Sequence, residues 1–182
     1  MEVTITTESI NCCITDPSRL TSDLDEPNCT DVLTTNRCAM CEGRGRAISR
    51  KTVLLMVKPE LLEQATSGSY RFCTARDCPV VYFEDDGSHQ FTVDDLRVRV
   101  GWKVKDDPIP VCYCFGFEES DIRNEITQTG NTTIPERVSK LIREGLCACE
   151  ARNPVGVCCL GEVKRVAQLL KSQHSENGSE VG

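Results

Sequence analysis

Thirteen cysteines in a chain of 182 residues constrain this protein more than any other feature. The number is odd, so the thiols cannot all pair with one another as disulfides. Eight of them fall into two sets of four, with Cys-x-Cys and Cys-x-x-Cys spacings that suit chelation better than cross-linking. The sequence therefore predicts a metal-binding protein, in which bound metal replaces part of a small hydrophobic core.

The start of the chain lacks the basic residues and the apolar run of a secretory signal, so we expect reduced thiols and a cytoplasmic protein. The formal net charge of −7 disfavours binding to nucleic acid, which requires clustered Lys and Arg. No stretch approaches the roughly 20 apolar residues that span a bilayer, so no membrane insertion is expected. Because no Ser-His-Asp or phosphate-loop pattern is present, we predict that the chain is not an enzyme.

Composition divides the sequence into four segments. Residues 1–36 are an acidic and polar tail without helical or strand periodicity, which predicts disorder. Residues 37–107 are rich in β-forming runs, residues 108–172 have a helical period, and residues 173–182 are a second polar tail. The predicted fold class is therefore α+β, with a small β-rich, zinc-ribbon-like module followed by a small helical domain.

Four runs of β-forming residues predict strands at 52–57, 70–73, 80–83 and 90–93. Asp85, Asp86 and Gly87 predict a hairpin turn between the last two strands. Pro59 lies in the first turn of a short helix expected at 58–64.

Apolar residues recur with a helical period in the second half of the chain. This pattern predicts helices at 118–129, from Thr133 to Gly145, and from about Gly161 to residue 172. Thr133 and Glu136 have the spacing of a capping box at the start of the second helix.

The first cysteine set consists of Cys38-x-x-Cys41 and Cys73-x4-Cys78. Two thiolate pairs on two loops can surround one cation tetrahedrally, which is the arrangement that zinc prefers. Four thiolates leave no open position for water. We therefore predict a structural Zn²⁺ bound by Cys38, Cys41, Cys73 and Cys78, rather than a catalytic one.

The second set lies in the helical part and offers more thiols than one centre needs. Two of its cysteines precede a predicted helix, and four follow about one helical hairpin later, an order that suits a binuclear iron–sulfur cluster. Thiolate counting alone does not separate iron from zinc, so a second zinc site is the alternative. The six candidates are Cys112, Cys114, Cys147, Cys149, Cys158 and Cys159.

Stretches around both sets resemble one known family. PVCYC at 110–114 and NPVGVCC at 153–159 are similar to the ferredoxin-like domain of CopZ-type copper chaperones, a domain related to bacterioferritin-associated ferredoxin. YRFC at 70–73, CPVVYF at 78–83 and RVG at 99–101 resemble the zinc-binding half of the same family. The resemblance covers about residues 37–170 and implies one zinc ion and one [2Fe-2S] cluster.

The resemblance also implies the cluster ligands. The third ligand of the family lies four residues before the Asn-Pro pair and the fourth is the second member of the Cys-Cys pair, which here implies Cys112, Cys114, Cys149 and Cys159. Cys147 is the alternative third ligand, because its distance from Cys114 is nearer to the spacing of the ferredoxin relatives. We expect the turn at 153–156 to direct backbone N–H groups to cluster sulfurs.

The family's copper-carrying domain has a Met-x-Cys-x-x-Cys loop, and Cys38-Ala39-Met40-Cys41 lacks that placement of Met. The resemblance therefore implies a redox or metallochaperone-like accessory that supports copper handling by electron transfer. Its expected partner is a redox protein or a copper-handling protein. The alternatives are a carrier that stores or transfers iron–sulfur clusters and a zinc-only regulatory or interaction protein.

Three further cysteines, Cys12, Cys13 and Cys29, lie in the amino-terminal tail. They are either a transient site for a soft cation such as Cu(I) or spare thiols. The sequence makes no prediction of oligomeric state.

Overall fold

A computed structural model describes residues 36–178, and these residues belong to one compact unit. The amino-terminal tail with Cys12, Cys13 and Cys29 lies outside the described residues, as do residues 179–182. None of the helices in the described part is long and apolar enough to cross a membrane.

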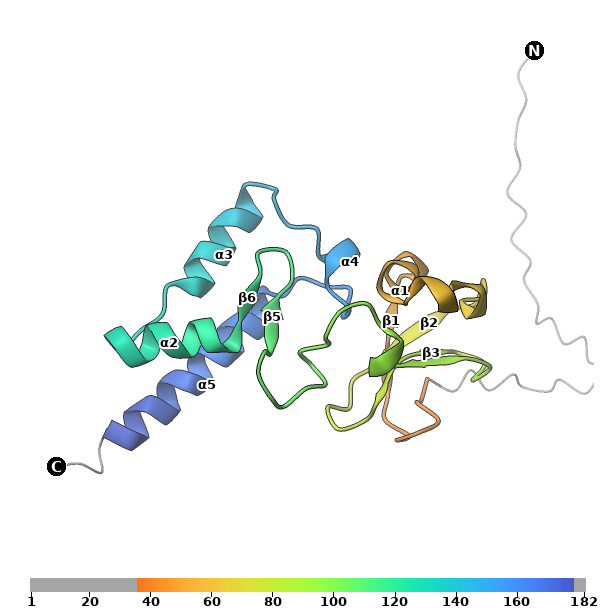
Figure 1. The fold of residues 1–182 in the computed structure, drawn as a ribbon, viewed down its shortest axis with the longest axis horizontal. Coiled ribbons are helices and arrows are strands. Elements are labelled where there is room, and N and C mark those ends of the chain that lie inside the picture. Colours follow the sequence, from red (N-terminus) through yellow and green to blue (C-terminus); the bar gives the residue numbers. More distant parts are fainter. Residues whose placement is uncertain (1–35, 179–182) are drawn as a thin grey trace, which may run out of the picture. The chain divides into compact units, whose positions relative to one another are not determined.

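A four-stranded antiparallel sheet forms the first part of the structure, in the order β1-β2-β3-β4 (Figure 1). Its strands are β1 (Gly45–Ile48), β2 (Tyr70–Cys73), β3 (Val80–Glu84) and β4 (Gln90–Thr92). Every residue of β3 is buried, as expected for one of the two inner strands of the sheet. The strands predicted at 70–73, 80–83 and 90–93 are thus confirmed, as is the turn at Gly87, whose φ of 75° favours glycine.

The strand predicted at 52–57 is wrong, because these residues lie mainly in helix α1 (Arg50–Met56). The Ser49 side chain caps the helix by accepting a hydrogen bond from the Lys51 N–H at 3.2 Å. Thr52, Val53 and Met56 are buried on one face of the helix, and this burial overrides the strand preference of β-branched residues. Two 3₁₀ helices, η1 (Pro59–Gln64) and η2 (Val93–Asp95), complete this part.

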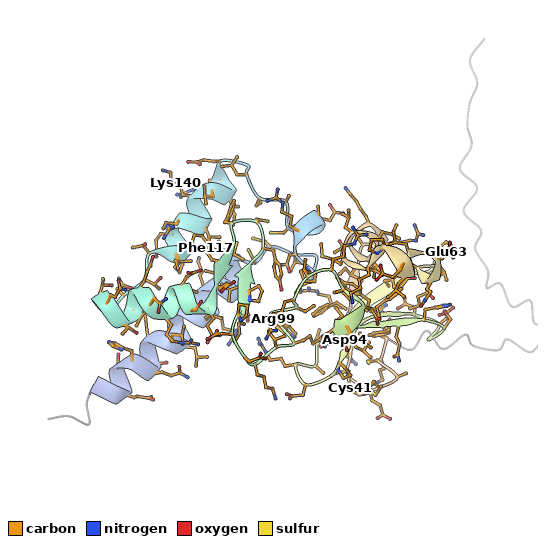
Figure 2. All side chains as sticks on the ribbon, in the orientation of Figure 1. Cys41, Glu63, Asp94, Arg99, Phe117 and Lys140 are labelled. Atoms are coloured by element: carbon orange, nitrogen blue, oxygen red, sulfur yellow. The ribbon has the colours of Figure 1, made fainter. Side chains whose placement is uncertain are left out.

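Helices dominate the second part, as predicted (Figure 1). Both α2 and α3 pack against α5, and the core between them includes Ile122, Ile126, Val138 and Val163. Phe117, labelled in Figure 2, packs against the same core. The helices are α2 (Glu119–Thr129), α3 (Ile134–Arg143), α4 (Cys149–Arg152) and α5 (Leu160–Gly178).

Three features of the second part differ from the prediction. A two-stranded hairpin, β5 (Pro110–Cys112) and β6 (Phe117–Glu118), precedes α2, and the short helix α4 follows α3. Helix α5 continues beyond the expected end at residue 172 into the segment predicted as a polar tail. Side-chain patterns do not reveal strands of two or three residues or single-turn helices, because such elements are too short for their period to repeat.

The predicted capping box at Thr133 and Glu136 is also wrong. Thr133 is the N-cap of α3, but its side chain makes no capping hydrogen bond. Instead the Glu125 carboxylate of α2 accepts hydrogen bonds from Thr132 Oγ1 at 2.7 Å and from the Thr133 N–H at 2.8 Å. A residue from the preceding helix therefore holds the turn between α2 and α3.

Candidate metal centres

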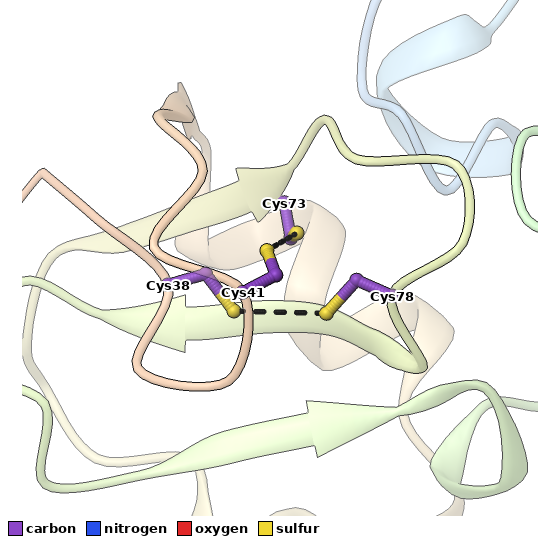
Figure 3. Close-up of side chains that lie close together, drawn as sticks. All are labelled: Cys38, Cys41, Cys73 and Cys78. Carbon is purple, nitrogen blue, oxygen red and sulfur yellow. Dashed lines mark hydrogen bonds between the residues drawn. The ribbon is translucent and has the colours of Figure 1, made fainter.

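The four cysteines of the first set meet at one end of the sheet (Figure 3). Their Sγ atoms all lie within 4.8 Å of one another, with 3.8 Å between Cys38 and Cys78 and 3.6 Å between Cys41 and Cys73. A tetrahedral site with Zn–S bonds of about 2.3 Å separates its sulfurs by about 3.8 Å. Two of the sulfur–sulfur distances thus match a tetrahedral zinc site, and the rest do not exceed 4.8 Å.

Two loops present these thiols. In the first loop, the backbones of Arg37 and Arg44 form an isolated antiparallel β-bridge, and the Cys38 N–H donates to the Gly43 carbonyl at 2.9 Å. The loop between them therefore closes around the sulfurs of Cys38 and Cys41. Cys73 ends β2 and pairs with Gly45 at the start of β1. This pairing of β1 with β2 therefore places the loop that carries Cys38 and Cys41 next to the loop that carries Cys73 and Cys78.

Residues from outside both loops hold the second loop in place. The Trp102 indole N–H donates to the Thr74 carbonyl at 2.9 Å, and Lys103 Nζ donates to the Ala75 carbonyl at 2.5 Å. These contacts join residues nearly thirty positions apart, and no pattern in the sequence predicts them. They fix the backbone from which Cys73 and Cys78 extend.

Two buried thiols of the first set favour the protonated form when no cation is bound. Burial raises the pKa of Cys73, and it raises the pKa of Cys78 to about 12. For the exposed Cys41, hydrogen bonds from Gly43 and the neighbouring thiols outweigh the effect of burial and lower the pKa. A bound cation would displace the remaining thiol protons, so metal binding here is coupled to proton release.

The second set lies inside the hydrophobic core of the helical part. Cys112, Cys114, Cys149 and Cys159 are all buried, and their sulfurs form two close pairs. Cys112 and Cys159 Sγ atoms are 3.0 Å apart, and Cys114 and Cys149 Sγ atoms are 3.6 Å apart. The pairs therefore join the β5–β6 hairpin to the segment at α4 and the start of α5, rather than joining Cys112 to Cys114 within one loop.

The two other candidates of this set lie elsewhere. Cys147 is half-buried and packs at the edge of the core, and Cys158 is exposed. The Ala148 N–H donates to Cys114 Sγ at 3.3 Å, which draws the start of α4 toward the hairpin. Burial favours Cys149 over Cys147 as a member of the central group.

Two thiols of this set, Cys149 and Cys159, favour the protonated form in the absence of a cation. Burial raises the pKa of Cys149 to about 12. The Cys159 thiol donates a hydrogen bond to Cys112 Sγ. This hydrogen bond raises the pKa of Cys159 and lowers the pKa of Cys112 to about 7. Four thiolates in an apolar core are stable only when a cationic centre balances their charge.

The turn at 153–156 forms as expected but does not direct its N–H groups to sulfur. The Val155 N–H donates to Asn153 Oδ1 at 3.0 Å, and the Gly156 N–H donates to the Asn153 carbonyl at 2.8 Å. A side chain of the sheet part instead donates a hydrogen bond to a carbonyl of the turn. Tyr82 Oη donates to the Pro154 carbonyl at 2.6 Å. This turn therefore anchors the segment that carries Cys149 and Cys159 on the sheet.

Comparisons with known proteins agree with the geometry of the first set. A family described as a zinc-binding domain, that of CopZ proteins, matches residues 35–97, which include all four clustered cysteines. The copper chaperone CopZ of Archaeoglobus fulgidus is 31% identical over 131 residues, which make up 71% of this chain and 61% of that protein. This chain therefore matches less than two thirds of that relative's length.

The same comparison extends to a solved structure. The X-ray structure of the Archaeoglobus fulgidus CopZ amino-terminal domain matches with a TM-score of 0.60 and 30% identity, and the match covers 71% of this chain and 96% of that domain. The match covers almost all of that domain, and it is longer than the zinc-binding stretch alone.

Proposed function

This chain belongs to the family of CopZ amino-terminal domains, and we propose that it is a zinc- and [2Fe-2S]-binding redox or metallochaperone-like accessory that supports copper handling by electron transfer. Zinc in this proposal is structural, and Cys38, Cys41, Cys73 and Cys78 are its ligands. The apolar cluster around this site contains only two large apolar side chains, Val80 and Phe83. Such a small core needs the metal as a cross-link.

The single observation that carries the cluster proposal is the burial of four reduced thiols as two close pairs. A [2Fe-2S] cluster takes four thiolates, two on each iron. Cys112 with Cys159 and Cys114 with Cys149 provide two such pairs in a dry core. When bound, the cluster would supply reversible one-electron chemistry, and the chain would exclude water from it and hold the thiols in place.

The proposed partner is a redox protein or a copper-handling protein. This proposal rests on the Archaeoglobus fulgidus relative, which aligns with 71% of this chain and is named a copper chaperone. Reduced thiols of this kind persist in the cytoplasm, which is where we place the protein. Iron–sulfur cluster transfer is the second candidate function. The two pairs lie on segments far apart in the sequence, so opening of either segment would release a cluster.

Metal analysis tests the proposal. We expect protein purified without oxygen to be coloured and to contain about one zinc, two irons and two sulfides per chain. The reduced protein should give the EPR signal of a [2Fe-2S] centre. A colourless protein with two zinc ions and no iron would leave only the zinc-dependent interaction function.

Incubation with an apo-ferredoxin separates the two cluster functions. Reversible reduction with the cluster retained on this chain supports electron transfer. Movement of iron and sulfide to the apo-ferredoxin would instead support the carrier function.

A further inference from the structure

We propose that a cavity between the sheet part and helix α5 binds a small anion with a flat apolar body, of the aryl phosphate or aryl carboxylate class. The cavity has a volume of about 240 Å³. Typical sites for drug-sized ligands have about 300–1,000 Å³, so the volume suits a smaller molecule. Its lining includes Arg46, Arg76, Trp102, Tyr113, Val157 and Arg165.

The charge of the lining selects an anion. Arg76 and Arg165 share a single carboxylate, that of Glu162, at N–O distances of 3.2 and 2.7 Å. The other lining carboxylate, Glu119, is already bound by Arg123 at 2.6 Å. Among the guanidinium and carboxylate groups of the lining, positive charge therefore remains in excess by one, although the whole chain carries a net charge of −7 and the proposed cluster ligand Cys159 also lines the cavity.

Arg46 contributes most to this excess. Its guanidinium donates to the Val155 carbonyl at 2.6 Å, and within residues 36–178 it forms no ion pair with a carboxylate. Arg46 is exposed overall, and the burial of part of its guanidinium lowers the pKa of that group, which reflects the cost of removing some water from a cation that has no carboxylate partner. A bound anion would offset that cost, and a planar guanidinium can bind phosphate or carboxylate oxygens through two parallel hydrogen bonds.

The remaining walls select a flat apolar body. Trp102 lines the cavity, with the Arg76 guanidinium carbon 4.1 Å from its ring centroid. Its indole N–H is already bonded to Thr74. The Tyr113 hydroxyl is also satisfied, because it accepts from the Gly101 N–H at 2.8 Å and donates to the Arg99 carbonyl at 3.0 Å. Both aromatic side chains thus have their polar atoms bonded within the protein, and Val104 and Val157 add further apolar surface.

The fluorescence of Trp102 tests this inference directly, because Trp102 is the single tryptophan of the chain. The full-length, metal-bound protein is titrated with phenyl phosphate, with inorganic phosphate and with phenol. We expect saturable binding of phenyl phosphate, at least tenfold weaker binding of inorganic phosphate, and no saturable binding of phenol. Equal binding of phenyl phosphate and phenol, or no response to phenyl phosphate, would overturn the proposal.

Two variants and a control locate the site. Arg46→Gln should weaken binding of phenyl phosphate about tenfold, because it removes one charge-assisted hydrogen bond. Val157→Phe should also weaken binding, because it fills the cavity without changing its charge. Arg143→Gln on α3 removes an arginine that does not line the cavity, so it should bind like the unmodified protein. Zinc content and urea unfolding show whether each variant is folded.

Unchanged binding in both cavity variants would show that the probe binds elsewhere and that the proposal is wrong. The proposed cluster ligand Cys159 also lines the cavity, so the probe is titrated into protein of known iron content. A protein without iron that still binds phenyl phosphate would refute the redox function alone, and a coloured protein that ignores the probe would refute the cavity alone.

Discussion

At the scale of single residues, Cys147 and Cys149 are two positions apart but occupy different environments. Cys149 opens helix α4, is 8% exposed, and has its Sγ 3.6 Å from that of Cys114. Cys147 lies on the preceding loop at the edge of the core. The start of helix α4 thus places the Cys149 thiol in the core, whereas the Cys147 thiol, on the loop before the helix, stays at the edge of the core.

We therefore predict that Cys149→Ser removes most of the iron from protein purified without oxygen, because serine is a poor ligand for iron in such a cluster. Cys147→Ser should retain the iron and the visible absorption. Cys158→Ser is the matched control, since this thiol is exposed. Loss of iron from the Cys147 variant with retention in the Cys149 variant would reverse the assignment.

Gly101 shows how a residue without a side chain positions the second set. A Cβ atom at this position would lie 1.9 Å from the Pro110 carbonyl oxygen, in strand β5. The backbone at Gly101 also donates to Tyr113, the residue between Cys112 and Cys114. Only glycine allows the connecting loop to lie this close to the strand that leads to these cysteines.

At the scale of secondary structure, the Glu125 carboxylate organises the turn between α2 and α3. It accepts hydrogen bonds from Thr132 and Thr133 and forms an ion pair with Arg137 at 3.1 Å. Burial would raise the pKa of this carboxyl, but these hydrogen bonds and the charge of Arg137 outweigh burial and lower it. The carboxylate therefore stabilises the fold above its ordinary pKa of about 4.3, and this contribution is lost as the pH falls through the lower pKa of the folded state.

We predict that Glu125→Gln lowers the free energy of unfolding by about 1–2 kcal/mol at neutral pH, because the amide replaces charged acceptors with weaker ones. The difference from the unmodified protein should shrink below about pH 4. Urea unfolding at several pH values measures both effects. Glu136→Gln is the control, since the exposed Glu136 holds the position of the predicted capping box and should change stability little.

At the scale of the whole described unit, two hydroxyl groups of the sheet part hold the segment of the second cysteine set. Tyr82 Oη donates to the Pro154 carbonyl at 2.6 Å, and Thr52 Oγ1 donates to the Glu150 carbonyl at 2.8 Å. Both side chains are buried, and helices α1 and α4 pack against each other beside them. The first cysteine set lies at the end of the sheet, and side chains packed on the sheet hold the segment that carries the second set.

We predict that Tyr82→Phe and Thr52→Val each lower the free energy of unfolding by about 1–2 kcal/mol, because the first leaves the buried Pro154 carbonyl without its donor and the second removes the buried donor to the Glu150 carbonyl. Their combined effect should differ from the sum, since both carbonyls belong to one short segment. Tyr70→Phe is the matched control on the same sheet. The Tyr70 hydroxyl is buried beside Thr66 and Glu84 but makes no hydrogen bond of good geometry in the described residues, so its removal should change stability less than either of the other substitutions. Equal destabilisation by Tyr70→Phe would contradict this account.

The sequence by itself determined the features that depend on near neighbours in the chain. The three confirmed strands and the three longer helices follow from runs and periods of apolar residues, and the close cysteine pairs are visible as spacings. The tertiary structure decided the remaining features. Burial against the sheet made residues 50–56 a helix, Glu125 rather than Glu136 bonded the turn before α3, and the pairing of Cys112 with Cys159 crossed from hairpin to helix. Each of these features depends on groups from separate parts of the chain. Their burial, hydrogen bonds and ion pairs contribute to stability only after the fold has brought the groups together.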